Sequence, residues 1–386
     1  MPIAVYALAL MAFSIGTTEF IVSGILPAIS SDLSVSIPTA GLLVSGYAAG
    51  VAVGGPILAL LTARFPAKPM ILLLGLIFAI GQLLCAIAPD YGLLMGARLI
   101  SACGHGVFFG LGSVAVSKLV PEHRRGAALS LFVGGITVAN ILGLPAGTAI
   151  GNAFGWRASF LCIAVMALLA VAAIALVLPG VKGEPEPEAP LALQAVQLRH
   201  PQVWTSYFTI AIVMVGSVSL GTFQVPLLIE ITRIDPATVP LFLLLGGAGS
   251  VVGIFIGGRL ADWRPLDALF GILLAQIASY LAVMASTTNP WAMGISLFAS
   301  AATGLAFSTP TQVRILNAAR AAPNLASTFI STAYNVGIAG GAFLGAVLLN
   351  SGMSYATMPV VGIVCSSLAA LMALASWVSE RRPALA

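Results

Sequence analysis

The sequence predicts an all-α integral membrane protein, with twelve transmembrane helices in two pseudo-symmetric six-helix bundles. Three observations lead to this prediction: an extreme apolar composition, a one-sided distribution of basic residues, and a polar segment near the middle of the chain. A membrane-spanning helix needs roughly 20 mostly apolar residues. A chain of 386 residues therefore has room for about twelve such helices joined by short connections.

The composition excludes an ordinary soluble domain. Hydrophobic residues make up 59% of the chain and charged residues only 7%, whereas a soluble domain carries about 25% charged residues. A soluble fold of this size has to face water and has no place for so much apolar surface. The net charge of +4 does not require a nucleic-acid partner, because the topology of the membrane spans accounts for it.

Apolar runs separated by turn signals such as Pro89-Asp90 and Asn289-Pro290 define the expected spans. The first run starts close to Met1 without a basic leading region, so we expect a retained helix and not a cleaved signal peptide. The twelve expected spans are 4–28, 38–62, 70–88, 91–119, 127–154, 158–178, 203–229, 238–258, 268–285, 291–312, 325–349 and 356–377.

Basic residues concentrate in alternate connections. If the N-terminus is cytoplasmic, the external connections hold only Arg157 and Arg233, and Arg98 lies inside the membrane. The positive-inside rule then predicts cytoplasmic termini in a bacterial inner membrane. The cytoplasmic connections hold the other 13 basic residues: Arg64, Lys68, Lys118, Arg124, Arg125, Lys182, Arg199, Arg259, Arg264, Arg314, Arg320, Arg381 and Arg382.

A polar, proline-rich segment divides the chain into halves. Residues 179–202 alternate Glu and Pro, which disfavours a helix and is typical of a linker. We therefore expect an N-terminal bundle over residues 1–178 and a C-terminal bundle over residues 203–386. Two similar six-helix halves around a central path are typical of a transporter. Such a path lies within one chain, so a monomer suffices.

No cofactor or metal site is expected. The four cysteines lie in apolar runs at irregular spacing, without a metal or redox pattern. Walker A, H-E-x-x-H and G-x-S-x-G motifs are absent, which argues against an enzyme or an ATP-driven pump.

Glu19 is the only acidic residue well inside an expected span. A carboxylate at the centre of a membrane helix costs roughly 2.5–3.5 kcal/mol on insertion scales. We expect it to face the bundle interior and to be protonated part of the time, because loss of water disfavours the charged form. A group that gains and loses a proton suits proton coupling. A static, neutral or paired carboxylate is the alternative.

Arg98 is the only basic residue well inside a span, and we place it with Glu19 roughly 10–12 Å below the external surface. Because the two residues lie at equal depth, an ion pair or a switchable contact between Glu19 and Arg98 is geometrically possible. The alternative is a structural arginine bonded to backbone carbonyls. His105 lies two helical turns after Arg98 on the same face. Its imidazole suits a proton relay, although membrane histidines also act as helix–helix hydrogen bonders.

Span five carries a Gly/Pro-rich run around Gly143, Pro145 and Gly147, which permits close packing and a bend. Interior polar residues elsewhere are candidates to line a substrate cavity, although each alone also suits helix packing. The cavity candidates are Tyr47, Asn140, Gln224, Gln276, Gln312 and Asn335.

Several motifs resemble the drug:proton antiporter family 1 of the major facilitator superfamily, in its bacterial arabinose-efflux and chloramphenicol-efflux branch. The resemblance covers nearly the whole chain. It rests on Gly16-Thr17-Thr18-Glu19-Phe20, Gly24-Ile25-Leu26-Pro27, Val35-Ser36-Ile37-Pro38, Ala40-Gly41-Leu42-Leu43, His105-Gly106-Val107-Phe108-Phe109, Gly155-Trp156-Arg157, Leu243-Leu244-Leu245-Gly246-Gly247-Ala248-Gly249 and Asn335-Val336-Gly337-Ile338.

The resemblance implies roles for these residues. Glu19 would carry the proton, Arg98 would couple it, and Gly143, Pro145 and Gly147 would form a loosely matching antiporter motif. The cytoplasmic gate loops would use Arg64 and Lys68 in the first half, where Ala63 and Pro66 depart from the family pattern. In the second half the gate residues would be Gly258, Asp262 and Arg264.

The resulting hypothesis is a secondary transporter that exchanges protons for a small neutral or weakly charged molecule, such as a drug or sugar, by alternating access. Its partners would be the substrate, protons and the lipid bilayer. A proton symporter or facilitator for uptake on the same fold is the alternative, since the chemistry of Glu19 fits symport equally well. A membrane-embedded enzyme or sensor is a third reading, for which the sequence offers no catalytic constellation.

Overall fold

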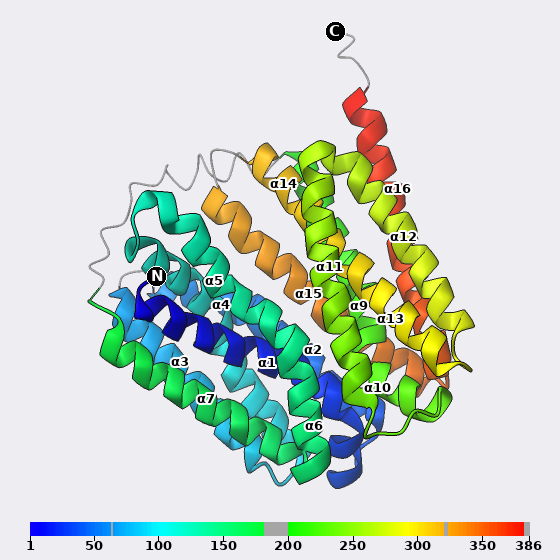
Figure 1. Ribbon diagram of the computed structural model, residues 1–386, viewed down its shortest axis with the longest axis horizontal. Helices are drawn as coiled ribbons and strands as arrows, with labels where there is room; N and C mark the ends of the chain where they lie inside the picture. The colour runs from blue at the N-terminus through cyan, green and yellow to red at the C-terminus, as the bar shows by residue number, and fades with distance from the viewer. Residues whose placement is uncertain (63–64, 181–199, 320–322, 382–386) are drawn as a thin grey trace. The chain divides into compact units, whose positions relative to one another are not determined.

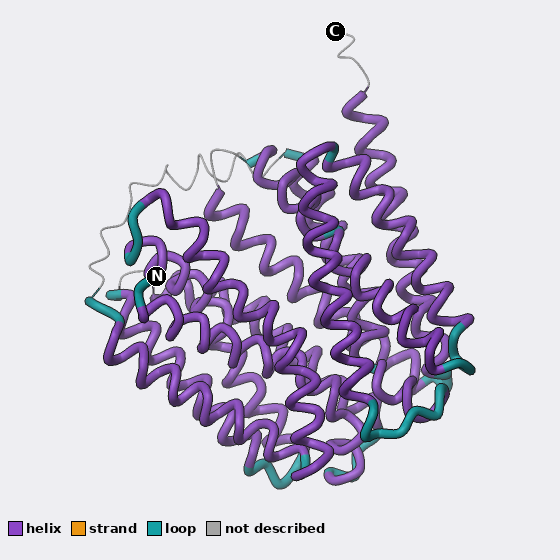
Figure 2. Tube along the Cα trace, viewed as in Figure 1, coloured by secondary structure: helices purple, strands orange, loops and turns teal. Residues whose placement is uncertain are grey.

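The structure, a computed structural model, describes residues 1–62, 65–180, 200–319 and 323–381, which are almost entirely helical (Figures 1 and 2). Within this part of the chain, twelve helical segments are long and apolar enough to cross a membrane. The predicted all-α fold with twelve spans is therefore confirmed. The helices of the first half are α1 (Ile3–Asp32), α2 (Ile37–Thr62), α3 (Ala67–Ala86), α4 (Tyr91–Lys118), α5 (Arg125–Val138), α6 (Leu144–Phe154) and α7 (Trp156–Val177).

The second half repeats the pattern of long apolar helices with short connections. Its helices are α9 (Pro201–Thr222), α10 (Gln224–Pro226), α11 (Val239–Trp263), α12 (Pro265–Ala285), α13 (Pro290–Ala306), α14 (Ser308–Ala318), α15 (Pro323–Asn350) and α16 (Met358–Arg381). Short 3₁₀ turns at Glu122–Arg124 and Tyr355–Thr357 precede α5 and α16.

Three expected spans are interrupted. A π-helical turn, Ala139–Gly143, joins α5 to α6, and a second one, Leu227–Ile231, follows α10. The tenth span breaks between α13 and α14 at Phe307. Each break lies within three residues of a proline (Pro145, Pro226 or Pro310). A proline cannot donate the amide hydrogen bond to the preceding turn, and this favours a local change of helical pitch.

Two predicted boundaries are wrong. Span one was expected to end near Pro27, but α1 continues through Pro27 to Asp32, because an internal proline removes only one bond of a long helix. The depth assigned to Glu19 from Pro27 is therefore too shallow. Arg314 was expected in a connection, but it lies on α14, is 5% exposed, and donates to Ser376 of α16 at 2.8 Å.

The chain forms two compact units. The first comprises Met1–Pro185 with Pro236–Leu243, and the second Glu186–Asp235 with Leu244–Ala386. In the first unit α1 packs against α2, α5, α6 and α7, while α3 and α4 pack against each other. In the second unit α9 packs against α14, α15 and α16, and α12 packs against α13 and α16. Most of the expected linker, residues 181–199, lies outside the described residues.

Candidate functional site

Arg98 lies at the centre of a polar cluster in the first unit. Its side chain is fully buried, and Nη1 donates to the carbonyl oxygen of Thr18 at 2.7 Å and to the Thr18 hydroxyl at 3.2 Å. The guanidinium also stacks on the ring of Tyr47, with 4.1 Å between its central carbon and the ring centroid. Nε and Nη2 of Arg98 have no hydrogen-bond partner. The cation is thus held in place but retains donors for a further acceptor.

A chain of hydrogen bonds runs from Arg98 through three helices. The Thr18 hydroxyl accepts from Arg98 and donates to Oε1 of Gln82 at 2.7 Å. Gln82 Nε2 in turn donates to the Ser101 hydroxyl at 3.0 Å, and Ser101 donates to the carbonyl oxygen of Ala97 at 2.9 Å. All four side chains are buried. The chain joins α1, α3 and α4 and fixes where Arg98 lies.

His105 and Tyr47 form a second arm of the same cluster. Tyr47 Oη and His105 Nδ1 are 3.1 Å apart, and both side chains are buried. Since Tyr47 contacts both Arg98 and His105, the two basic residues share one aromatic neighbour. Phe109 also packs against the imidazole, at 5.3 Å between ring centroids.

Glu19 directly follows Thr18 on α1 and is half-buried. Its carboxylate and the Arg98 guanidinium attract each other electrostatically. Both ion pairs found among the described residues lie elsewhere, so no salt bridge within 4.0 Å joins Glu19 to Arg98. The carboxylate is therefore beside the cation without being bonded to it.

The Gly/Pro-rich run packs span five against the helix that carries Glu19. A Cβ atom added at Gly143 would lie 2.3 Å from the Thr17 hydroxyl oxygen, and one added at Gly147 would lie 2.2 Å from Cδ1 of Ile21. Thr17 and Ile21 flank Glu19 on α1. A larger residue at either glycine would require Thr17 or Ile21 to shift, as expected where small residues lie between membrane helices.

A second polar cluster lies in the C-terminal unit around Gln276, which is fully buried. Gln276 Nε2 donates to the Ser217 hydroxyl and to the Tyr280 hydroxyl, both at 3.0 Å. The Ser217 and Tyr280 hydroxyls are 3.1 Å apart. Gln276 Oε1 has no partner, so the cluster presents an unused acceptor inside the second unit.

The other cavity candidates are scattered. Asn335 is buried on α15, where Nδ2 donates to the carbonyl oxygen of Ser331 at 3.0 Å and Oδ1 has no partner. Asn140, Gln224 and Gln312 are half-buried, on the first π-helical turn, α10 and α14 respectively. The structure therefore brings Tyr47 to the Arg98 cluster and places Gln276 in a cluster of its own.

The candidate gate-loop residues have the following surroundings in the structure. Arg64 lies outside the described residues. Lys68 donates to the carbonyl oxygens of Ala175 and Leu178, and so caps the end of α7. In the second half Gly258 is half-buried and Asp262 is exposed, while Arg264 pairs with Asp267 at 3.5 Å.

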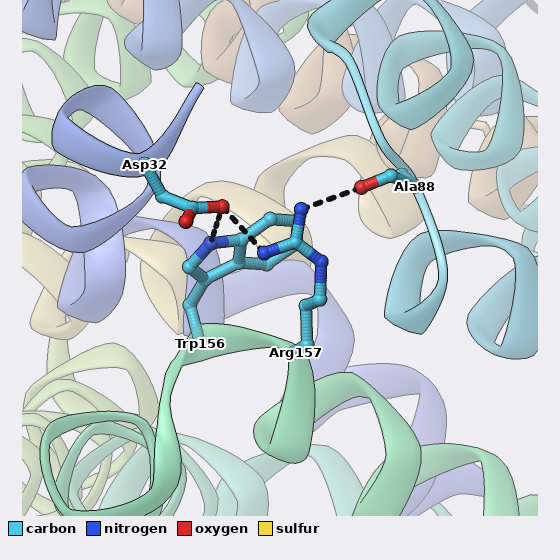
Figure 3. Close-up of polar contacts among 4 residues, drawn as sticks. All are labelled: Asp32, Ala88, Trp156 and Arg157. Carbon is cyan, nitrogen blue, oxygen red and sulfur yellow. Dashed lines mark hydrogen bonds and ion pairs between the residues drawn. The ribbon is translucent and has the colours of Figure 1, made fainter. Parts of the chain in front are cut away.

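Sequence reasoning missed a clasp at the opposite end of the first unit (Figure 3). Asp32, at the end of α1, accepts hydrogen bonds from Trp156 Nε1 at 3.0 Å and from Arg157 Nη1. Arg157 Nη2 also donates to the carbonyl oxygen of Ala88 at 2.8 Å. The clasp joins the end of α1, the start of α7 and the loop between α3 and α4. The motif Gly155-Trp156-Arg157 stands out in the sequence, but nothing in the sequence marks Asp32 as its partner.

Twelve apolar helices in two units, with polar clusters buried inside each unit, define a multi-pass membrane transporter. The chain belongs to the Major Facilitator Superfamily, which it matches over residues 8–342. It is therefore a transporter and not an enzyme.

Relatives support this assignment along almost the full length. The chain is 38% identical over 372 residues to "Inner membrane transport protein YdhP" of Escherichia coli (strain K12), covering 96% of this chain and 95% of that protein. It is 31% identical to "Chloramphenicol resistance protein" of Streptomyces lividans, covering 90% of each. The predicted resemblance to the chloramphenicol-efflux branch is confirmed. Twelve apolar helices and a relative named for the inner membrane support a multi-pass inner-membrane location.

The crystal structure of a bacterial homologue of the human lysosomal transporter Spinster, inward-facing and unoccupied, superimposes with a TM-score of 0.78 over 99% of this chain and 98% of that chain. Sequence identity is 17%, so this likeness concerns the fold alone.

Proposed function

We propose that this protein is a proton-coupled exporter of a small neutral or weakly charged molecule that works by alternating access. The observation that carries the proposal is the relation of Glu19 to Arg98. A buried guanidinium with two unused donor nitrogens lies beside a carboxylate that it does not bond. A buried donor without a partner costs about 1–3 kcal/mol of stability, and a charged donor costs more.

This arrangement favours a contact that depends on protonation. An ionised Glu19 is drawn to Nε and Nη2 of Arg98, whereas a protonated Glu19 is not. Loading a proton therefore changes the force between α1 and α4. Since Gly143 and Gly147 pack span five directly on α1, a movement of α1 is passed to α5 and α6. His105, through Tyr47, is the group that would exchange the proton with Glu19, while Arg98 keeps its positive charge throughout.

The substrate class follows from the unused acceptors. Gln276 Oε1 and Asn335 Oδ1 are buried carbonyl oxygens without partners. Such groups suit hydroxyl or amide donors of a neutral polar molecule and offer no fixed charge to hold a dication. A relative named for chloramphenicol resistance agrees with an exported drug of this kind.

The topology and domain boundaries are part of the proposal. Both termini are cytoplasmic, because 13 of the 16 basic residues lie in or next to the connections on that side, with Arg314 of α14 among them, and 2 lie on the other side. Residues 1–178 and 203–386 are the two moving bundles, joined by residues 179–202, and a monomer carries the whole path.

The test is proton flux in proteoliposomes with an inward-directed acid gradient. Phenicols, pentoses and nucleosides are added in turn, and the internal pH is followed for the wild type, Glu19→Gln and Glu122→Gln. We expect one compound class to trigger proton movement in the wild type and in Glu122→Gln, which changes an exposed residue outside the cluster. Glu19→Gln should abolish it.

Substrate flux without compound-dependent proton movement would remove Glu19 from the coupling and favour the facilitator. Substrate accumulation on the acidic side versus the alkaline side separates antiport from symport, because the two move substrate in opposite directions relative to the proton.

A further inference from the structure

Two adjoining cavities lie at one corner of the C-terminal unit, where α11 ends and α12 begins. One is a pocket of about 460 Å³ and the other is a groove of about 400 Å³. Trp263 and Asp267 line both, so the two cavities are direct neighbours. Neither cavity contains a residue of the Arg98 cluster, the Gln276 cluster or the proposed proton path. A role for this corner would therefore be separate from proton coupling.

The groove is apolar and is formed by α11, α12 and α13. Ile256, Leu260 and Ile272 are among its walls. It follows α11 from Gly253 to Trp263, a rise of about 15 Å in an α-helix. Gly271 forms part of its surface, and a Cβ added there would meet no atom within 4 Å. The groove is therefore open at Gly271.

The pocket has both polar and apolar walls and carries more basic than acidic side chains, namely Arg264 and Arg314 against Asp267. Trp377 Nε1 donates to Asp267 at 3.1 Å, and Arg264 lies 3.5 Å from the same carboxylate. The Arg264 guanidinium lies over the ring of Trp263, 5.3 Å from its centroid. Because a guanidinium carries five donors in a planar fork, Arg264 retains donors that match an oxyanion such as a phosphate.

An apolar groove that ends in a cationic, aromatic pocket matches an amphiphile. We propose that this corner binds one phospholipid of the surrounding bilayer, with its phosphate on Arg264 and one acyl chain in the groove between α11 and α12.

The position of the corner argues for a bilayer lipid as the occupant. Phe255 is 72% exposed and Trp263 74% exposed on α11, a helix apolar enough to cross the membrane. Exposed aromatic side chains of this kind on a membrane-spanning helix are able to contact lipid. Tryptophan and arginine at the end of a span are typical of the headgroup region. A phospholipid bridging α11 and α12 would also stabilise the unit by binding its folded state.

The test is native mass spectrometry of the purified full-length protein with added phosphatidylglycerol, together with thermal unfolding at increasing lipid. The wild type should retain one lipid that raises the unfolding midpoint. Arg264→Gln removes the phosphate partner, and Gly271→Leu places a side chain in the groove at a position where its Cβ meets no atom within 4 Å. Each should lower the retained lipid by about tenfold, as expected for the loss of one charge-assisted hydrogen bond or of the chain site.

Two matched variants serve as controls. Arg259→Gln removes an exposed charge from α11 outside both cavities, and Gly246→Leu adds the same side chain at an open glycine of α11 away from the groove. Both should retain the lipid. Equal retention in all five proteins, or no retained lipid in the wild type, would overturn the proposal.

A further experiment with a water-soluble phosphate ester distinguishes a lipid headgroup from a free phosphate as the ligand. Glycerol 1-phosphate should not raise the unfolding midpoint at concentrations where the lipid does. If it acts as strongly as the lipid and Gly271→Leu has no effect, the pocket binds a free phosphate and the lipid proposal is wrong.

Discussion

One guanidinium nitrogen of Arg98 bonds both oxygen atoms of Thr18, the carbonyl at 2.7 Å and the hydroxyl at 3.2 Å. The contact ties α4 to α1 at the residue directly before Glu19. This contact is what a purely structural membrane arginine would make, because the closer of its two partners is a backbone carbonyl. The two unused nitrogens are what distinguish Arg98 from a purely structural residue.

Replacing Thr18 by Val tests whether this contact positions Arg98. The change keeps the shape of the side chain but removes the hydroxyl that links Arg98 to Gln82. We expect a loss of about 1–3 kcal/mol in stability, because Gln82 Oε1 is left buried without a donor, and a slower proton flux. Thr17→Val is the control, since the Thr17 hydroxyl bonds only within its own helix, to Phe13 at 2.8 Å. Equal losses in both variants would contradict a positioning role for Thr18.

Tyr47 contacts both His105 and Arg98, and two substitutions distinguish the effects of these contacts. Tyr47→Phe removes the hydroxyl beside His105 Nδ1 but keeps the ring under Arg98, while Tyr47→Leu removes both. We expect Tyr47→Phe to alter the pH dependence of transport, because it changes only the environment of His105. Tyr47→Leu should also slow transport at every pH, since a buried cation–π contact contributes about 2 kcal/mol. Identical pH profiles for the wild type and Tyr47→Phe would exclude His105 from the proton path. The measurement is initial flux over a pH range that extends well to both sides of the ordinary imidazole pKa of about 6.5.

The sequence was sufficient for the spans because hydropathy and charge report directly on contact with lipid and water. It singled out Glu19 and Arg98 for the same reason: an ionisable group in an apolar run is conspicuous. The irregularities within the helices could not be predicted from the sequence in the same way. Pro27 is accommodated within α1, whereas Pro145 follows a π-helical turn, and only the packing around each proline decides between these outcomes.

The partners of the singled-out residues were not predictable in the same way. Thr18 and Ser101 are small hydroxyl residues of a kind found throughout the chain, and their importance depends on which helices touch. Asp32 was overlooked because it was assigned to a connection, although it terminates α1. Proximity to Glu19 along the chain was the one signal that pointed to Thr18.

Gly143 tests the packing of span five on the helix that carries Glu19. Gly143→Ala would place its Cβ 2.3 Å from the Thr17 hydroxyl and close to two further Thr17 atoms. We expect a loss of about 1–3 kcal/mol from overpacking and a reduced transport rate, because α1 and span five must separate to admit the methyl group. Gly134→Ala on α5 is the control, since a Cβ there meets no atom within 4 Å and alanine favours the helix. Wild-type stability and flux in Gly143→Ala would show that the glycine is not required for this approach.

The clasp of Asp32 with Trp156 and Arg157 is expected to stabilise the first unit and to contribute little to coupling. Asp32 and Arg157 are both partly exposed, at 46% and 38%, so the ion pair itself contributes at most about 1 kcal/mol. The hydrogen bond from Arg157 to the Ala88 carbonyl adds about 1 kcal/mol. Arg157→Gln should therefore lower the thermal unfolding midpoint by about 2–4 °C, measured by far-ultraviolet circular dichroism.

Arg157→Lys separates the two parts of this contribution. A lysine ammonium lacks the planar fork that reaches Asp32 and Ala88 together, so we expect it to restore about half of the loss. Asp32→Asn combined with Arg157→Gln should cost less than the sum of the single changes, because each single change removes the same ion pair. Arg259→Gln, an exposed charge outside the clasp, should leave the midpoint unchanged. Strict additivity of the two clasp substitutions would mean that Asp32 and Arg157 do not act together, and a proton flux reduced as far as in Glu19→Gln would assign the clasp to the transport cycle.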